Sequence, residues 1–184
     1  MQKAAPSIFG GVRVLELASP RVQYAGKLFG DMGADVIKIE RPGGDTARRI
    51  GPFVGDLPDP NASLSFWHYN TSKRSITLDF ESADGRELLL RLVKDADIIF
   101  EGFNPDYLAA IGLDYKSLND VNPRILMGSL TEFGRNGPWR DWKGGDLVQM
   151  ALGGVMASCG YDDPTAPPIA PGVYQSLHIG CHYL

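Results

Sequence analysis

One segment near the start of the chain, residues 11–45, constrains the fold more than any other. It holds two short apolar runs rich in β-branched residues, 12–17 and 36–39, with a stretch of helical length between them and a Gly-rich turn after them. Such runs suit strands buried on both faces of a parallel sheet. Ligands of open parallel sheets bind beyond the carboxyl ends of the strands. The segment therefore predicts an α/β protein with a nucleotide-like ligand near residues 18–24 and 40–45.

The alternation of strand and helix continues after this segment. Residues 50–72 interrupt it as a surface excursion, because Pro52, Pro58 and Pro60 argue against a regular helix there. Beyond it, short apolar runs predict three further strands, over residues 73–79, 98–100 and 124–130.

Helices are predicted between and after these strands. Ser82 is placed to cap a helix that runs to Ala96. Residues 146–158 are apolar on nearly every side, which predicts a buried helix. Residues 159–172 are rich in proline and predict an extended connector to a last helix that opens near residue 173.

Composition narrows the class of ligand. The chain has 184 residues, a net charge of −4 and no basic stripe, which argues against nucleic acid and favours a small molecule. No apolar run is long enough to cross a bilayer, so no membrane contact is expected. Cys159 and Cys181 lack a CxxC partner, which favours reduced thiols in a cytoplasmic protein. His178 and His182 are four residues apart, but no acidic third ligand accompanies them, and no metal site is predicted.

Four longer stretches carry a resemblance to a known family. They are MGADVIKIERPGGD (32–45), NTSKRSITLDF (70–80), ADIIFEGFNPDYLAAIGLDY (96–115) and FGRNGPWRDWKGGDLVQMALGG (133–154). In this order and spacing, they resemble the N-terminal portion of the family III CoA-transferases. That family includes formyl-CoA transferase, the carnitine CoA-transferases and α-methylacyl-CoA racemase.

The resemblance implies a fold and a partner as well as a reaction. It implies a Rossmann-like open parallel sheet with helices on both faces, the large-domain part of a fold in which two subunits interlock as rings. Residues 1–158 would form the CoA-binding domain. Residues 159–184 would form a connector and the start of a helix that leads into a C-terminal region missing from this chain. The expected substrates are an acyl-CoA and a small carboxylic acid, with no permanently bound cofactor, in a homodimer or heterodimer of family members.

The same resemblance implies which residues contact coenzyme A. They are Arg41, Leu78, Gly102, Phe103 and Lys143. Arg41 would meet a phosphate or the adenine, for which a planar guanidinium is suited, and its alternative is a surface pair with Glu40 or Asp45. Family members more often carry Asn where this chain has Gly102 and Arg where it has Ala110, so two polar contacts are absent.

Two basic residues at the start of the predicted third strand have a less definite role. Lys73 and Arg74 would either add positive charge to the CoA site or form a solvated strand entry.

The chemistry of the family requires a carboxylate that this chain lacks at the expected place. An Asp attacks the acyl-CoA thioester and then carries CoA as its own thioester, which only an acid can do. The family pattern D-x-x-x-G corresponds here to Ser176–Gly180, so Ser176 occupies the Asp position, and a shift of one residue brings Gln175 there. A serine ester can be hydrolysed but cannot carry CoA.

Three functions are therefore compatible with the sequence. The first is a CoA-transferase with an altered nucleophile position at Ser176 or Gln175. The second is a non-catalytic subunit that pairs with an Asp-bearing homologue. The third is an acyl-CoA racemase, isomerase or hydrolase, although Gly145 stands where racemase relatives carry a His before Asp146.

Overall fold

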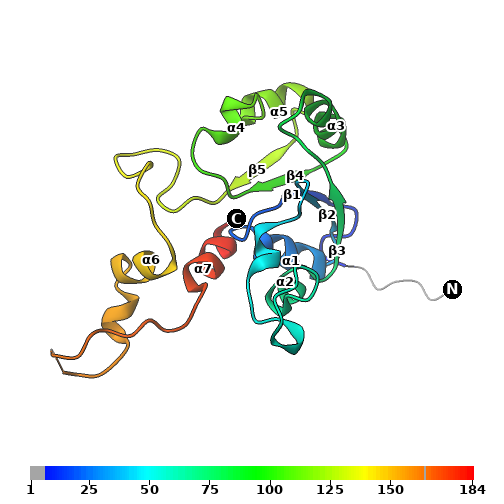
Figure 1. Cartoon of the computed structure of the whole chain (residues 1–184). Coiled ribbons are helices and arrows are strands. Elements are labelled where there is room, and N and C mark those ends of the chain that lie inside the picture. Colours follow the sequence, from blue (N-terminus) through cyan, green and yellow to red (C-terminus); the bar gives the residue numbers. More distant parts are fainter. Residues whose placement is uncertain (1–6, 164) are drawn as a thin grey trace.

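A computed structural model describes residues 7–163 and 165–184. The first six residues of the predicted 1–158 domain, and Pro164 of the predicted connector, lie outside the described residues. The centre of the structure is a parallel sheet of five strands in the order β3-β2-β1-β4-β5 (Figure 1). The strands are β1 (Arg13–Leu17), β2 (Asp35–Glu40), β3 (Lys73–Thr77), β4 (Ile98–Glu101) and β5 (Leu126–Ser129). In the register, Leu15 is level with Ile37 and Ile99. The predicted α/β fold is confirmed.

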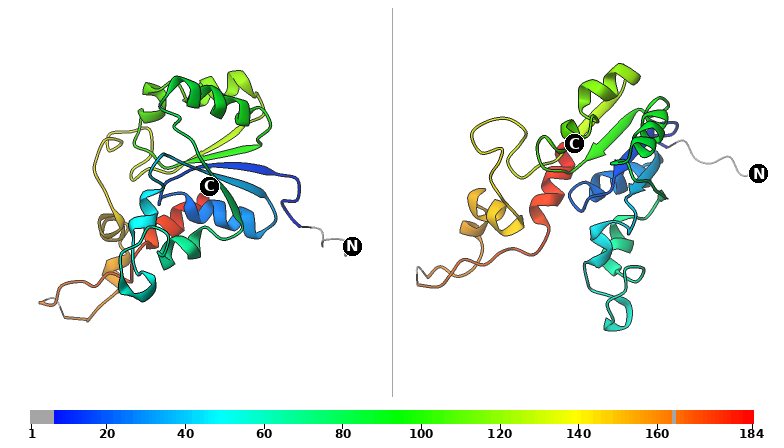
Figure 2. Two further views of the ribbon diagram at one scale, coloured as in Figure 1. Left: turned by 45° about the vertical axis from the view of Figure 1, so that its right-hand side comes forward. Right: turned by 45° about the horizontal axis from the view of Figure 1, so that its top comes forward.

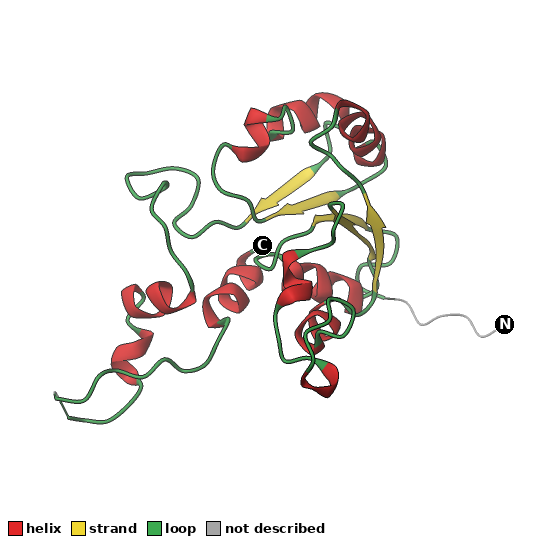
Figure 3. Ribbon diagram, viewed as in Figure 1, coloured by secondary structure: helices red, strands yellow, loops and turns green. Residues whose placement is uncertain are grey.

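Helices cover both faces of the sheet, because successive strand residues point to opposite sides. One face is covered by α3 (Ala83–Val93), α4 (Tyr107–Ala110) and α5 (Tyr115–Val121). The other is covered by α1 (Gln23–Asp31) and by α7 (Gln175–Tyr183), whose Cys181 is buried (Figures 2 and 3). None of the helices within the described residues combines the length and the apolar character that a membrane span requires.

The prediction that residues 50–72 hold no regular helix is wrong. Helix α2 (Leu64–Tyr69) begins after the last of the three prolines, and the hydroxyl of Ser63 accepts a hydrogen bond from the Phe66 N–H at 3.0 Å. This capping bond satisfies one of the free N–H groups at the helix start. The prolines instead shape the loop before α2, together with two short 3₁₀ helices, η1 (Thr46–Arg49) and η2 (Val54–Asp56).

The prediction of a buried helix over residues 146–158 is also wrong. The helix α6 (Asp146–Leu152) ends early, because Gly154 adopts a left-handed conformation with φ of 77°, and a separate 3₁₀ helix, η3 (Val155–Ser158), follows it. Met150 is the one residue of α6 that is buried, whereas Leu147 and Leu152 are each 61% exposed. Helix α6 stands away from the sheet in Figure 1, so this apolar surface has no cover among the described residues.

A cluster of buried ions joins three strands of the sheet to the turn after β2. The Lys38 ammonium is 1% exposed and lies 2.7 Å from Glu16 Oε1 and 2.6 Å from Asp45 Oδ2. The second oxygen of Glu16 accepts a hydrogen bond from Lys73 Nζ at 2.7 Å. Asp45 Oδ2 has no well-aligned hydrogen bond, so its contact with Lys38 is an ionic one. Two ammonium groups and two carboxylates balance each other in this cluster.

Burial and ion pairing act against each other on the two lysines. Burial disfavours the charge on Lys38, but Glu16 and Asp45 outweigh it and raise the pKa of Lys38. For Lys73, burial is the larger effect and lowers its pKa to about 8, although Glu16 pulls in the opposite direction. The cluster joins β1, β2, β3 and the turn after β2.

A second buried carboxylate, Glu40, organises that turn. It accepts hydrogen bonds from Arg48 Nε at 2.6 Å, from Ser75 Oγ at 2.6 Å and from the Asp45 N–H at 2.9 Å. Burial alone would raise the pKa of Glu40, but the bonds from Arg48, Ser75 and Asp45 lower it to about 2. The turn that carries Arg41 is therefore held at both ends.

The close approach of α1 to the ion cluster predicts the effect of a single methyl group. A Cβ at Gly26 would lie 1.8 Å from Glu16 Oε2. We expect Gly26→Ala to destabilise the fold by at least about 2 kcal/mol, because α1 or the buried carboxylate must move. Urea titration measures this change. The cost should largely disappear in a Glu16→Ala background, and an equal cost in both backgrounds would contradict the explanation.

The depressed pKa of Glu40 predicts acid sensitivity. A carboxyl group with a pKa of about 2 in the folded state and 4.5 in the unfolded state stabilises the protein fully above pH 4.5. That contribution is lost progressively as the pH falls from 4.5 towards 2. The free energy of unfolding between pH 5 and pH 3 measures it.

A matched pair of variants assigns this acid sensitivity to Glu40. Arg48→Met should reduce the slope with pH, because the pKa of Glu40 rises without its main donor. Lys116→Met removes an exposed ion pair with Asp120 and should leave the slope unchanged. Equal slopes in all three proteins would contradict the assignment.

Candidate functional site

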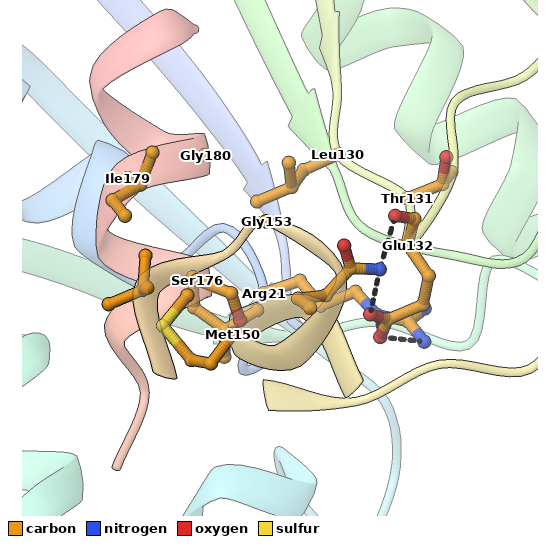
Figure 4. Close-up of a pocket in the computed structure, with 12 residues that line it drawn as sticks. Arg21, Leu130, Thr131, Glu132, Met150, Gly153, Ser176, Ile179 and Gly180 are labelled. Carbon is orange, nitrogen blue, oxygen red and sulfur yellow. Dashed lines mark hydrogen bonds and ion pairs between the residues drawn. The ribbon is translucent and has the colours of Figure 1, made fainter. Parts of the chain in front are cut away.

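Two adjoining cavities lie at the carboxyl ends of the strands, the edge where the sequence predicts a ligand. The first, here called the central cavity, has a volume of about 490 Å³ and is lined by residues that follow β1, β2, β4 and β5 and by the first residue of α6. The second, here called the α6–α7 cavity, has a volume of about 380 Å³ (Figure 4). Arg21, Glu132 and Leu177 line both cavities, so the two cavities share a wall.

Arg41 lies at the central cavity on a platform of aromatic rings. Its guanidinium carbon is 5.2 Å from the ring centre of Phe80, 5.3 Å from that of Phe103 and 5.2 Å from that of Tyr107. Its Nη2 donates a hydrogen bond of 2.5 Å to the Tyr107 hydroxyl, and its Nη1 lies 3.2 Å from Glu81 Oε1. Burial, together with the hydrogen bond to Glu81, raises the pKa of Tyr107 to about 12. The platform fixes a cation beside an open cavity.

The alternative partners expected for Arg41 are wrong. Arg41 pairs with Glu81, whereas Glu40 is held by Arg48 and Asp45 by Lys38. Both of the expected carboxylates are therefore already occupied inside the fold.

The structure brings together only some of the residues expected at coenzyme A. Arg41 and Phe103 line the central cavity. Gly102 lies behind that wall, where a Cβ would be 2.7 Å from Ser19 Oγ. Leu78 lies in a separate surface hollow with Leu88.

Lys143 lines a further hollow, which also includes Arg21 and Glu132 and therefore borders the central cavity. The loop that carries Lys143 is held by three aromatic side chains. Trp139 and Trp142 stack with ring centres 5.3 Å apart, and Phe133 packs edge-on against both.

Lys73 and Arg74 lie at the amino end of β3, far from the carboxyl ends of the strands. The side chain of Lys73 is 2% exposed and belongs to the buried ion cluster, so it is neither a solvated residue nor a ligand contact. Arg74 is exposed and pairs with Asp35, which confirms the solvated strand entry for this residue.

Ser176 and Gln175, the two residues expected at the nucleophile position, have different surroundings. Ser176 lines the α6–α7 cavity (Figure 4). Its hydroxyl donates a hydrogen bond of 2.7 Å to Asp146 Oδ1. Its backbone N–H donates to the same oxygen at 2.8 Å. Gln175 lines neither cavity, and its side chain reaches only the carbonyl of Val173.

The sequence did not predict the polar bridge that separates the two cavities. Arg21 Nη1 donates to the Gly102 carbonyl at 2.9 Å, and its Nη2 lies 3.0 Å from Glu132 Oε1. Gln149 Nε2 donates to the Glu132 carbonyl at 2.6 Å, and the contacts of Arg21 and Gln149 with Glu132 are dashed in Figure 4. Their positions in the sequence could have pointed to this bridge, because Arg21 and Glu132 both follow the carboxyl ends of strands, where ligands of open parallel sheets bind.

Both histidines of α7 have a hydrogen-bond partner within the chain. The Tyr69 hydroxyl lies 2.5 Å from His178 Nε2, and burial lowers the pKa of His178 although Asp146 acts in the opposite direction. His182 Nδ1 lies 2.7 Å from the His178 carbonyl. Within the described ranges, no three His, Cys, Asp or Glu side chains are grouped to hold a metal ion.

Comparison with known proteins gives the site its context. Residues 9–184 match the sequence model of CoA-transferase family III. A succinate–glutarate CoA-transferase from Agrobacterium fabrum is 42% identical, over 89% of this chain and 41% of the relative. A subunit of succinyl-CoA:(R)-benzylsuccinate CoA-transferase from Thauera aromatica is 39% identical, over 84% of this chain and 38% of the relative.

A solved structure shows the same arrangement. The crystal structure of a CAIB/BAIF family protein from Brucella suis superposes with a TM-score of 0.83 at 35% identity, covering 97% of this chain and 49% of that one. The chain spans about four tenths of the length of the curated relatives it matches. With this match in sequence and in fold, the chain belongs to CoA-transferase family III.

Proposed function

We propose that this protein takes part in the transfer of CoA between an acyl-CoA thioester and a small carboxylic acid. The observation that carries the proposal is Arg41, fixed on three aromatic rings at a cavity that is also lined by Asp146, the hydrogen-bond partner of Ser176. An acyl-CoA is an extended ligand with a charged nucleotide at one end and a thioester at the other. The Arg41 cation suits the nucleotide end, and the polar pair of Asp146 and Ser176 suits the thioester end. The two curated relatives above are named as CoA-transferases.

In this proposal five residues contact coenzyme A. The Arg41 guanidinium binds a phosphate or stacks on the adenine, and Phe103 supports the pantetheine arm beside Gly102. Lys143 contributes a positive charge from the neighbouring loop, and Leu78 provides apolar contact from the position directly after β3. No permanently bound cofactor takes part.

The proposal also includes the cellular location of the protein and its binding partner. We place it in the cytoplasm, where its free thiols Cys159 and Cys181 stay reduced. We also propose a dimer with a family member, which would cover the exposed apolar residues of α6 such as Leu147. The partner is either a second copy or a different chain.

A second candidate function follows from Ser176. A chain that lacks the Asp at this position could serve as the non-catalytic subunit of a heteromeric transferase, and one relative is named as a subunit. Purification of the full-length protein, with any homologue that accompanies it, separates the two candidates. Succinyl-CoA and glutarate serve as probe substrates. Transfer by the single chain supports the first candidate. Transfer only with a second, homologous chain supports the second, and no transfer in either case contradicts both.

The position of Arg41 predicts a specific loss of CoA binding. Arg41→Ala should weaken the binding of CoA by about tenfold to a hundredfold, because it removes a charge-assisted contact. Isothermal titration with CoA measures the effect. Arg74→Ala is the matched control, since Arg74 is an exposed arginine at the opposite edge of the sheet. Equal affinities of the two variants would contradict the placement of CoA at Arg41.

A further inference from the structure

Tyr174 joins the connector to α7 in a backbone conformation that bulky residues rarely adopt. Its φ of 61° and ψ of 17° lie in the left-handed region. The other non-glycine residues with a positive φ among the described residues are Asp56, Ser72 and Asp106. Aspartate tolerates this region because its short polar side chain can bond to the nearby backbone, which a tyrosine ring cannot do. A bulky side chain held in this way at a cavity points to a function for that side chain.

The start of α7 holds Tyr174 against the central cavity. The Tyr174 carbonyl accepts the first hydrogen bond of the helix, from the His178 N–H at 3.1 Å. The residue is partly buried and lines the central cavity together with Arg41, Phe103 and Asp146. Burial and the negative charge of Asp146 raise the pKa of the Tyr174 hydroxyl, so this group keeps its proton at neutral pH. It can therefore donate a hydrogen bond.

The other side-chain donors of the central cavity are engaged within the fold. The hydroxyls of Ser19 and Thr46 donate to acceptors of the chain at 3.4 Å and 3.5 Å. Arg21 donates to a backbone carbonyl and is paired with a carboxylate, and Arg41 donates to a hydroxyl of its aromatic platform. The Tyr174 hydroxyl has no hydrogen bond to any of the residues that the structure describes. It is thus the donor that the cavity leaves for a ligand.

The charge beside Tyr174 restricts the acceptor that it can bind. A carboxylate or phosphate of a ligand would meet the negative charge of Asp146 there and be repelled. A neutral carbonyl oxygen would not. An acyl-CoA has neutral carbonyls in the amides of its pantetheine arm and in its thioester. The thioester is the better match, because Ser176, which lies two residues after Tyr174 and is bonded to Asp146, belongs to the proposed thioester end.

We propose that the Tyr174 hydroxyl donates a hydrogen bond to the thioester carbonyl oxygen of a bound acyl-CoA. This inference rests on the proposed function and adds to it a residue that recognises the acyl carbonyl rather than CoA itself. Attack on the thioester places negative charge on the same oxygen, and a donor that is already in position stabilises such a charge.

Two unreactive analogues of succinyl-CoA isolate this contact. In the ketone analogue, a methylene group replaces the thioester sulfur and the carbonyl is kept. In the thioether analogue, a methylene group replaces the carbonyl and the sulfur is kept. Isothermal titration of the full-length protein, together with any homologue that accompanies it, gives the dissociation constants of both analogues and of CoA.

Tyr174→Phe removes the hydroxyl and keeps the ring. It should weaken the binding of the ketone analogue by about threefold to tenfold, because one hydrogen bond is lost. The affinities for the thioether analogue and for CoA should stay unchanged, which also shows that the variant is folded. Tyr183→Phe is the matched control: it makes the same substitution on the same helix, at a residue that is 88% exposed, and should change none of the three affinities.

The pattern across the three ligands decides the outcome. Unchanged binding of the ketone analogue by Tyr174→Phe would overturn the inference. An equal loss for all three ligands would also overturn it, since the hydroxyl would then serve CoA binding or the fold and not the carbonyl. Either result leaves the proposed function standing, because the wild-type protein still binds CoA. A wild-type protein that binds none of the three ligands would contradict the proposed function together with the inference.

Discussion

The Lys38 ammonium is the interaction on which the rest of the structure depends. It lies in the middle of the sheet, 1% exposed, and two carboxylates on different segments compensate its charge. Removing one partner of a buried ion pair typically costs about 3–5 kcal/mol, since the other charge stays buried. Glu16 extends the cluster to Lys73 and therefore to β3. Asp45 extends it to the turn after β2, so the turn is fixed by the same charge that holds the sheet together.

The position of Arg41 follows from this constraint. Asp45 and Glu40 hold the turn from inside, which leaves Arg41 on the outer side of the turn at the cavity. The three rings beneath it come from the segments that follow β3 and β4. A guanidinium held over aromatic faces keeps its charge and has little orientational freedom left to lose when a ligand binds. The Arg41 side chain is therefore preorganised.

The sequence was sufficient to predict those features of the fold that depend on residues close together along the chain. The apolar runs of β1 and β2 and the Ser82 cap of α3, which accepts from the Gly85 N–H at 3.1 Å, were predicted because local pattern and capping chemistry decide them. The early end of α6 at Gly154 and the helix α2 depended on turn geometry that single residues express only weakly.

The sequence was not sufficient to predict contacts between segments that lie far apart along the chain. A lysine in an apolar strand looks the same whether it is solvated or ion-paired, so the role of Lys38 was invisible. The contact between Asp146 and Ser176 joins the starts of two helices whose relative placement no local pattern encodes. The resemblance to a family located Ser176 but could not show which side chain it meets.

Gly102 shows how a close contact between distant segments restricts the residue that a position can hold. A Cβ there would lie 2.7 Å from Ser19 Oγ and 2.8 Å from Arg21 Cβ, so the loops after β1 and β4 approach each other more closely than any larger residue permits. Asparagine at this position requires the loop that carries Ser19 and Arg21 to withdraw first. A chimera that places asparagine at position 102 and keeps this loop therefore inherits a steric conflict at the wall of the cavity.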